Sequence, residues 1–211
     1  MFITFEGIDG SGKSTQITRA EAFLRARGLD VLVSREPGGS QLGEAIRTIL
    51  LDPKWHSMTG RAEYFLYSAS RAQLVDEIIR PRLAKANAVV ILDRYDDSST
   101  AYQGGGRELG VSIIEEINRV ATGGLVPDIT FVLDIDWATS IARRARAGLE
   151  NDRLEQNAYD FFERTRRAYH ELCRRHPERM ILVDAAQSED DVFQAISNAL
   201  SERLQTMSDE R

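Results

Sequence analysis

The sequence has little of what builds a disulfide scaffold, a metal cluster or a membrane span. Its 211 residues include a single cysteine, Cys173, so no disulfide can form within the chain and no set of cysteines can bind zinc. His56, His170 and His176 are far apart and lack ligand spacing, so we expect surface or capping positions and no protein-only metal site. No apolar run approaches the ~20 residues of a membrane span, and no signal-peptide pattern opens the chain. These absences fit a reduced, cytoplasmic setting without a membrane partner.

The sequence also lacks the basic excess of a general nucleic-acid binder. Its formal net charge is −6, so we expect no nucleic-acid polymer as a partner. Apolar residues make up 42% and charged residues 28%, which is ordinary for a globular protein. No repeat, low-complexity tract or linker divides the chain, and we therefore predict a single domain over residues 1–211.

Short, nearly continuous apolar runs alternate with longer segments of helical period. The runs are Phe2–Phe5, Val31–Val33, Ala88–Leu92, Ile129–Leu133 and Met180–Val183. Continuous runs are typical of strands buried on both faces of a parallel sheet. We predict an α/β fold with a central parallel sheet of about five strands and helices on both faces. Ligands of such sheets bind at the carboxyl ends of the strands.

The loop after the first run reads GIDGSGKS and fits the phosphate-loop pattern G-x-x-x-x-G-K-[ST]. The alternative is a plain glycine-rich turn, which the strand before the loop and the helical pattern after it disfavour. Glycines let the backbone approach a phosphate, Lys13 can reach the β- and γ-phosphates, and Ser14 can ligate Mg²⁺. The residues expected to bind ATP here are Gly7, Ile8, Asp9, Gly10, Ser11, Gly12, Lys13, Ser14 and Thr15.

A phosphate loop identifies a donor nucleotide and leaves the acceptor open. The chain has no Asn-Lys-x-Asp stretch of the kind that reads guanine in GTPases, and it is short for a motor. A small phosphotransferase is therefore favoured. The alternatives are a related kinase for another monophosphate or small alcohol, and a binding module that uses the nucleotide as a switch.

The loop after the third run begins with Asp93 and Arg94. A strand-ending aspartate is more often a helix cap or turn residue, but beside a phosphate loop it predicts the carboxylate that holds Mg²⁺ through water. An arginine next to it is costly to bury unless it meets an anion. We interpret Gly104–Gly106 as a flexible turn without assigned chemistry. The intervening side chains that can hydrogen-bond a nucleobase and its sugar are Ser98, Ser99, Tyr102 and Gln103.

Several segments, in this order and spacing, resemble the thymidylate kinase family over nearly the whole chain. They are EGIDGSGKST, REPGGSQLGEAIR, FLYSASRAQL, DRYDDSSTAYQGGGR, PDITFVLDI and NDRLE. The resemblance implies a P-loop nucleoside monophosphate kinase-like fold, direct in-line transfer of a phosphoryl group from MgATP to dTMP, and a homodimer.

The resemblance also implies an acceptor site. Asp9 approaches the 3′-hydroxyl of the sugar, and Arg47 and Arg94 hold the dTMP phosphate. Lys13, Asp9, Arg94 and Arg153 are the residues expected to act in catalysis. The full acceptor set is Asp9, Glu36, Pro37, Gly38, Arg47, Tyr67, Arg71, Arg94, Ser98, Ser99, Tyr102 and Gln103. Without the resemblance, Glu36–Gly39 is equally well read as a tight turn after the second strand.

Base recognition is implied in the same way. Arg71 bonds the thymine edge, Ser99 and Gln103 contact the base, and Tyr102 crowds the sugar where a ribonucleotide carries its 2′-hydroxyl. Tyr67 stands where the family commonly has Phe, so its hydroxyl needs a partner. Taken alone, the segment that carries Tyr67 and Arg71 is an amphipathic helix whose aromatics are more often core.

The arginine-rich stretch RRARAGLENDRLE, residues 143–155, has two readings. Charge runs are usually solvated helix faces with interspersed ion pairs. The bacterial type of the family implies instead a short lid near 142–155, jointed at Gly148, whose arginines supply the charge that the phosphate loop lacks. We expect Arg153 to act in catalysis, Arg143 and Arg146 to contact ATP, and Arg144 to be solvated.

Overall fold

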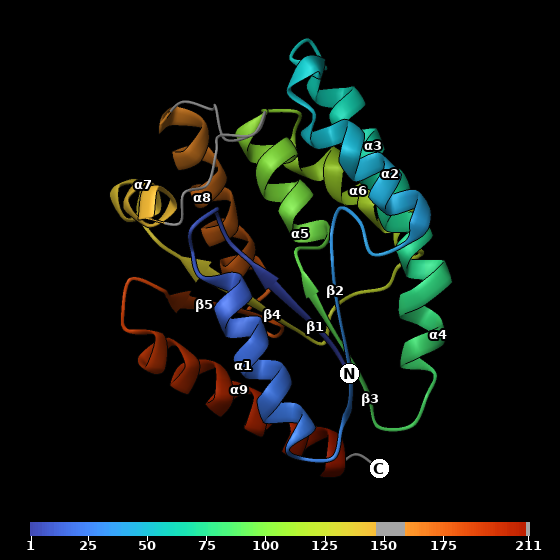
Figure 1. Cartoon of the computed structure of the whole chain (residues 1–211), viewed down its shortest axis with the longest axis vertical. Helices are drawn as coiled ribbons and strands as arrows, with labels where there is room; N and C mark the ends of the chain where they lie inside the picture. The colour runs from blue at the N-terminus through green and yellow to red at the C-terminus, as the bar shows by residue number, and fades with distance from the viewer. Residues whose placement is uncertain (147–158, 210–211) are drawn as a thin grey trace.

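The computed structural model describes residues 1–146 and 159–209, which form a parallel sheet covered by helices on both faces (Figure 1). The strands are β1 (Phe2–Glu6), β2 (Asp30–Arg35), β3 (Ala88–Asp93), β4 (Ile129–Asp134) and β5 (Met180–Asp184). They pair in the order β2-β3-β1-β4-β5, with every neighbouring pair parallel. The predicted fold class is confirmed, and all the apolar runs are strands.

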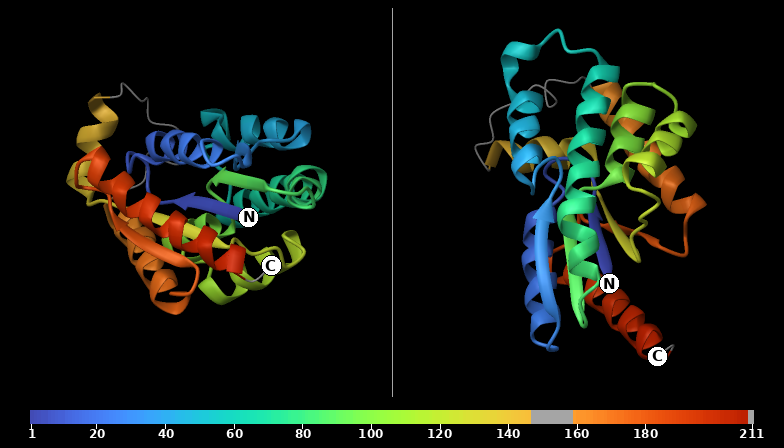
Figure 2. Two further views of the ribbon diagram at one scale, coloured as in Figure 1. Left: turned by 90° about the horizontal axis from the view of Figure 1, so that it is seen from below. Right: turned by 90° about the vertical axis from the view of Figure 1, so that its right-hand side faces the viewer.

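Helical segments connect and cover the strands, as Figures 1 and 2 show. They are α1 (Lys13–Arg25), α2 (Gln41–Leu51), η1 (Pro53–Trp55), α3 (Gly60–Leu74), η2 (Val75–Ile79), α4 (Arg80–Leu83), α5 (Asp96–Ser99), η3 (Thr100–Gly106), α6 (Val111–Ala121), α7 (Trp137–Arg146), α8 (Tyr159–Arg175) and α9 (Glu189–Asp209). Side-chain caps begin several of them; for example, Ser40 accepts a hydrogen bond from the Gly43 N–H at the start of α2, and Thr59 accepts one from the Ala62 N–H at the start of α3. None of the helices in the described ranges is long and apolar enough to cross a membrane.

One face of the sheet carries the larger core. Ile3 and Phe5 of β1 point toward α1 and α9, where they join a buried cluster that includes Leu24 and Ile196. Figure 2 shows α1 and α9 lying on this face. Side chains alternate along a strand, so the same strand presents its other residues to the opposite face.

The opposite face is covered by α3, η2, η3 and α8. Phe2 packs there with Leu74 and Ile79, and its ring meets Tyr95 edge-on at 5.0 Å. A third cluster includes Val132 of β4 and Tyr169 of α8. The charged residue of β1 on this face, Glu6, is fully buried beneath the loop that follows β3.

The glycines of η3 are not a flexible turn, and that interpretation was wrong. Gly104–Gly106 end a π-helix that lies directly against α8. A Cβ atom on Gly105 would lie 2.6 Å from the Ala168 Cβ, and one on Gly106 would lie 2.5 Å from the Thr165 Oγ1. The glycines are therefore needed because α8 approaches this backbone too closely for a side chain.

Candidate active site

The phosphate loop follows β1 at the carboxyl edge of the sheet. Its first glycine, Gly7, has a φ of +133°, and a Cβ there would lie 2.5 Å from the Leu133 carbonyl oxygen. Gly12 has a φ of 94° and directly precedes α1. The loop is thus pressed against β4 at one end and joined to a helix N-terminus at the other, which is a geometry that binds phosphate.

Lys13 is buried within the loop that it serves. Its Nζ donates hydrogen bonds to the carbonyl oxygens of Gly7 at 3.2 Å and of Ile8 at 3.3 Å. Burial lowers the pKa of Lys13, the nearby Arg94 lowers it further, and the carboxylates of Asp93 and Asp9 oppose both effects. The ammonium group is therefore held close to the loop, where an entering phosphate would replace carbonyl partners.

A pocket of about 760 Å³ opens beside this loop. Its lining includes most of the residues predicted to bind ATP or the metal: Asp9, Gly10, Ser11, Gly12, Lys13, Ser14, Thr15, Asp93, Arg143 and Arg146. Gly7 and Ile8 contribute carbonyl oxygens to Lys13 instead of lining the pocket. Gln16, Ala185, Gln187, Glu189 and Val192 also line it, and nothing in the sequence pattern singled them out.

Helix α7 packs against the phosphate loop. Ser140 Oγ donates a hydrogen bond to the Asp9 carbonyl oxygen at 2.7 Å, and Arg143 Nη2 donates one to the Ala185 carbonyl oxygen at 2.8 Å. Arg144 was expected to be solvated, and this was wrong. Its side chain is buried over Gly10, where an added Cβ would lie 3.4 Å from the Arg144 Cγ. Arg153 and Gly148 lie outside the described residues.

The donor set at the pocket floor fits a magnesium ion that is shared with phosphates. The buried Oδ1 of Asp93 accepts no hydrogen bond from the described part of the chain, and Ser14 lines the same pocket. The described residues hold no group of three or more His, Cys, Asp or Glu side chains that could bind a metal without phosphate. Mg²⁺ commonly takes one or two protein oxygens and completes its shell with phosphates and water.

The histidines lie apart from this pocket. His56 is exposed, His170 Nε2 lies 3.1 Å from Asp134 Oδ1, and His176 Nδ1 lies 3.7 Å from Glu178 Oε1. His56 thus has the surface position that the sequence predicted, whereas His170 and His176 are partly buried.

A second pocket of about 210 Å³ adjoins the first. Its lining contains eleven of the residues predicted for the acceptor: Asp9, Glu36, Pro37, Arg47, Tyr67, Arg71, Arg94, Ser98, Ser99, Tyr102 and Gln103. Leu51 and Tyr95 line it as well, and both were missed. Gly38 does not line the pocket, although its N–H donates to Ser70 Oγ at 3.2 Å and so shapes the loop.

Arg94 lies between the two pockets. Its Nη2 donates hydrogen bonds to Asp9 Oδ1 at 2.6 Å and to the Tyr102 hydroxyl at 3.1 Å, and its Nη1 donates to Ser98 Oγ at 3.2 Å. The backbone φ of Arg94 is 71°, which is uncommon for a residue other than glycine. Burial raises the pKa of Asp9, but Arg94 and Lys13 outweigh it and hold that pKa below its ordinary value. Asp9 and Arg94 are therefore a charged pair.

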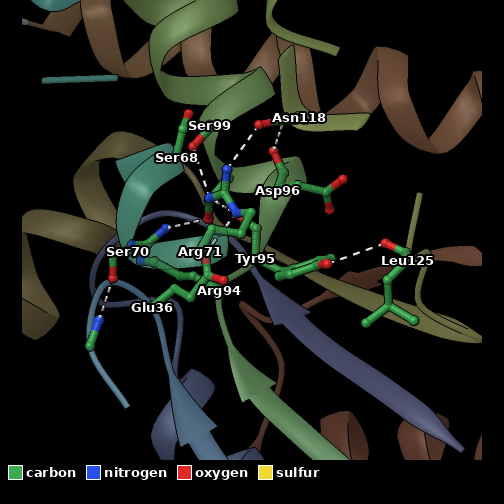
Figure 3. Close-up of polar contacts among 12 residues, drawn as sticks. Glu36, Ser68, Ser70, Arg71, Arg94, Tyr95, Asp96, Ser99, Asn118 and Leu125 are labelled. Carbon is green, nitrogen blue, oxygen red and sulfur yellow. Dashed lines mark hydrogen bonds and ion pairs between the residues drawn. The ribbon is translucent and has the colours of Figure 1, made fainter. Parts of the chain in front are cut away.

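Arg71 is fully buried in a network that Figure 3 shows. Its Nε donates to Glu36 Oε2 at 2.8 Å, Nη1 donates to Asn118 Oδ1 at 2.8 Å, and Nη2 donates to the Tyr95 carbonyl oxygen and to Ser99 Oγ, both at 3.0 Å. A guanidinium has five N–H donors, so the described residues leave one on Nη1 for a ligand. Burial raises the pKa of Glu36 to about 7 against the opposing effect of Arg71.

Two supporting residues of the site were missed by sequence reasoning. Asn118 of α6 donates through Nδ2 to the Asp96 carbonyl oxygen at 2.9 Å, which turns its Oδ1 toward Arg71. Glu6 accepts hydrogen bonds from the Tyr95 N–H at 2.7 Å, from the Tyr169 hydroxyl at 2.9 Å and from Ser98 Oγ. The only available signal for Glu6 was a charged residue at the end of an apolar run, directly before the phosphate loop.

Four residues line both pockets: Asp9, Glu36, Arg47 and Arg94. Arg47 donates to the Pro37 carbonyl oxygen at 3.1 Å, so it is tethered to the loop after β2. Two arginines at the junction of a phosphate-loop pocket and a smaller neighbour favour transfer of a phosphoryl group between two bound molecules.

Comparison with known proteins agrees with this geometry. The family model described as thymidylate kinase matches residues 5–196. A thymidylate kinase of Deinococcus radiodurans is 46% identical over 203 residues, covering 96% of this chain and 97% of that protein. One of Solidesulfovibrio magneticus is 46% identical over 210 residues, covering 97% and 100%. The crystal structure of thymidylate kinase from Ehrlichia chaffeensis superposes with a TM-score of 0.76 at 32% identity, covering 95% of this chain and 98% of that one. The chain belongs to the thymidylate kinase family.

Proposed function

We propose that the protein phosphorylates dTMP to dTDP, with MgATP as the donor of the γ-phosphoryl group. The observation that carries the proposal is the shared lining of the two pockets. Asp9, Arg47 and Arg94 border both the larger, phosphate-loop pocket and the smaller one. A phosphoryl group that passes from one pocket to the other must cross this junction.

The residues at the junction neutralise and orient charge. Lys13 faces the β- and γ-phosphates from the loop, while Arg47 and Arg94 bind the acceptor phosphate. Asp9 fixes the Arg94 guanidinium through the 2.6 Å hydrogen bond before any substrate binds. Preorganised cations of this kind stabilise the transition state of phosphoryl transfer without a covalent intermediate.

Mg²⁺ would be held by Ser14, by Asp93 through water and by the phosphates of ATP. When bound, the ion neutralises charge that develops on the β- and γ-phosphoryl oxygens. The unsatisfied buried oxygen of Asp93 supports this assignment.

The acceptor pocket is suited to a flat base with a sugar beside it. Tyr67 offers a ring to stack on the base, and Arg71 offers its remaining N–H at the base edge. Tyr102 would crowd the 2′-hydroxyl of a ribonucleotide, and its own hydroxyl already bonds Arg94 at 3.1 Å.

The sequence expectations about the lid, the setting and the assembly also remain proposals. A lid near 142–155 would place Arg153 at the transferred group, and closure would exclude water. We further propose that residues 1–211 act as a single kinase domain, that the protein is a homodimer, and that it works in the cytoplasm. Exposed apolar side chains on α2 and α3, among them Ile49 and Phe65, support the dimer.

The direct test is to follow the label from γ-³²P-ATP in the presence of Mg²⁺ and dTMP. We expect label in dTDP, with ADP formed in equal amount. Tight ATP binding without labelled dTDP would contradict the proposal and favour a nucleotide-dependent binding module.

A further inference from the structure

A buried carboxylate stands behind the acceptor pocket. Glu63 of α3 is only 1% exposed and does not line the pocket itself. Its Oε1 accepts a hydrogen bond from Gln103 Nε2 at 2.8 Å, and its Oε2 accepts one from Arg107 Nη2 at 3.2 Å. The cluster of Glu63, Gln103 and Arg107 therefore joins α3 to η3 and to the residue after it.

The contact fixes which way the Gln103 amide points. An ionised carboxylate accepts hydrogen bonds and donates none, so Gln103 must turn its NH₂ group toward Glu63. The remaining polar atom of that side chain is its carbonyl oxygen, Oε1. Gln103 lines the acceptor pocket beside Arg71 and Ser99.

The pocket then offers a hydrogen-bond acceptor and a donor of fixed identity. Gln103 Oε1 can accept from a ring N–H, and a guanidinium such as Arg71 can only donate. A keto pyrimidine matches this pair, since its N3 carries a hydrogen and its C4 carries an oxygen. A cytosine base presents the reverse at both positions, with a lone pair on N3 and an amino group on C4.

We propose that Glu63 determines base specificity by holding the Gln103 carbonyl oxygen toward N3–H of the bound pyrimidine. Glu63 acts as a positioning residue, because it reaches the base only through Gln103. The inference deepens the proposed function and rests on it, since the base in question is that of the acceptor nucleotide.

The test compares kcat/KM for dTMP and dCMP in the wild-type protein and in Glu63→Gln. A glutamine at position 63 can either accept or donate, so the Gln103 amide is free to turn over. We expect the preference for dTMP over dCMP to fall by about 10-fold or more, because kcat/KM decreases for dTMP and increases for dCMP. Gln103→Met, which removes the amide and leaves Glu63 in place, should lose the preference as well.

The matched control is Arg107→Met. It removes the cation from the same buried cluster and keeps the carboxylate that orients Gln103. We expect its dTMP to dCMP ratio to stay within about twofold of the wild-type ratio, even if the melting temperature falls. A purely structural role of the cluster would instead change both acceptors equally in both variants.

Two results would overturn the inference. One is an unchanged dTMP to dCMP ratio of kcat/KM in the Glu63→Gln variant, provided that this variant unfolds cooperatively and binds ATP as the wild-type protein does. The other is an equal loss of preference in Arg107→Met. A wild-type protein that phosphorylates neither acceptor would contradict the proposed function itself, and so the two failures can be told apart.

Discussion

Asp9 and Arg94 form a hydrogen-bonded ion pair of 2.6 Å across the boundary between the two pockets. Asp9 lies in the loop after β1, and Arg94 is the first residue after β3. These two strands are neighbours in the sheet. Phe5 of β1 pairs in register with Asp93 of β3, which brings the two loops together. The pairing of strands thus places the Arg94 guanidinium at the junction of the two pockets, where the proposed function puts the acceptor phosphate.

Arg94→Lys tests this pair. Lysine keeps the charge but cannot bond Asp9, Ser98 and Tyr102 with one planar group, so the cation loses its orientation. We expect kcat with dTMP to fall at least ~10²-fold while ATP still binds. Arg174→Lys, at an exposed arginine paired with Glu171, is the control and should keep full activity. Equal kcat in both variants would contradict the role of Arg94.

Arg153→Ala tests the lid. The phosphate loop has no arginine between Gly7 and Gly12, and the family resemblance implies that a lid arginine supplies the missing charge beside Lys13 and Arg94. We expect kcat to fall at least ~10²-fold without loss of ATP binding, measured by steady-state kinetics and by nucleotide titration. The control is Arg167→Ala, which removes an exposed arginine whose hydrogen bond within the described residues goes to the Glu163 carbonyl oxygen of its own helix. An unchanged kcat in Arg153→Ala would rule out the lid arginine.

Sequence reasoning could reach the sheet and most of the pocket lining because both are encoded locally. Continuous apolar runs identify buried strands, and the phosphate-loop pattern identifies its own loop. Parallel order then places the loops after β1 and β3 side by side. That Arg71 and Tyr67 line the smaller pocket could be predicted only through the family resemblance, because an amphipathic helix shows no difference between a core residue and a pocket residue.

What the sequence did not reveal depends on contacts between distant segments. Arg144 looked like part of a charge run, yet it packs over Gly10. Asn118 supports Arg71 from a helix that carries no motif. The glycines of η3 were interpreted as a turn, because no local sequence pattern indicates that α8 packs closely against this backbone.

Gly106→Ala tests that close approach. The new methyl group would lie 2.5 Å from Thr165 Oγ1 and 2.7 Å from the Phe161 ring, so α8 or η3 must shift. We expect a loss of about 1–3 kcal/mol in the free energy of unfolding, measured by urea denaturation. Gly60→Ala is the matched control, because among the described residues outside its own helix the nearest atom to the new Cβ would be the Arg107 Cβ at 3.7 Å. Equal stability of the two variants would show that η3 adapts to α8 without strain.

The buried Glu36 should make stability depend on pH. Burial raises its pKa from 4.5 to about 7, so between these values the folded chain keeps a proton that the unfolded chain has released. The contribution of Glu36 to the free energy of unfolding therefore decreases as the pH rises through this window. Glu36→Gln cannot titrate, and we expect it to lose less stability than the wild-type protein between pH 5 and pH 8, by on the order of 1 kcal/mol or more. Parallel pH profiles in thermal or urea unfolding would contradict the raised pKa.

The kinase activity is tested most directly by ADP formation from MgATP with dTMP, dUMP, UMP, dCMP and AMP as separate acceptors. We expect the highest kcat/KM for dTMP. We expect a rate lower by ~10–200-fold for dUMP, which lacks one methyl group, and far slower turnover of UMP because Tyr102 crowds its 2′-hydroxyl. Complete rejection of dUMP would mean that the base is recognised in another way. ADP formation with none of these acceptors, by a protein that binds ATP, would contradict the kinase assignment.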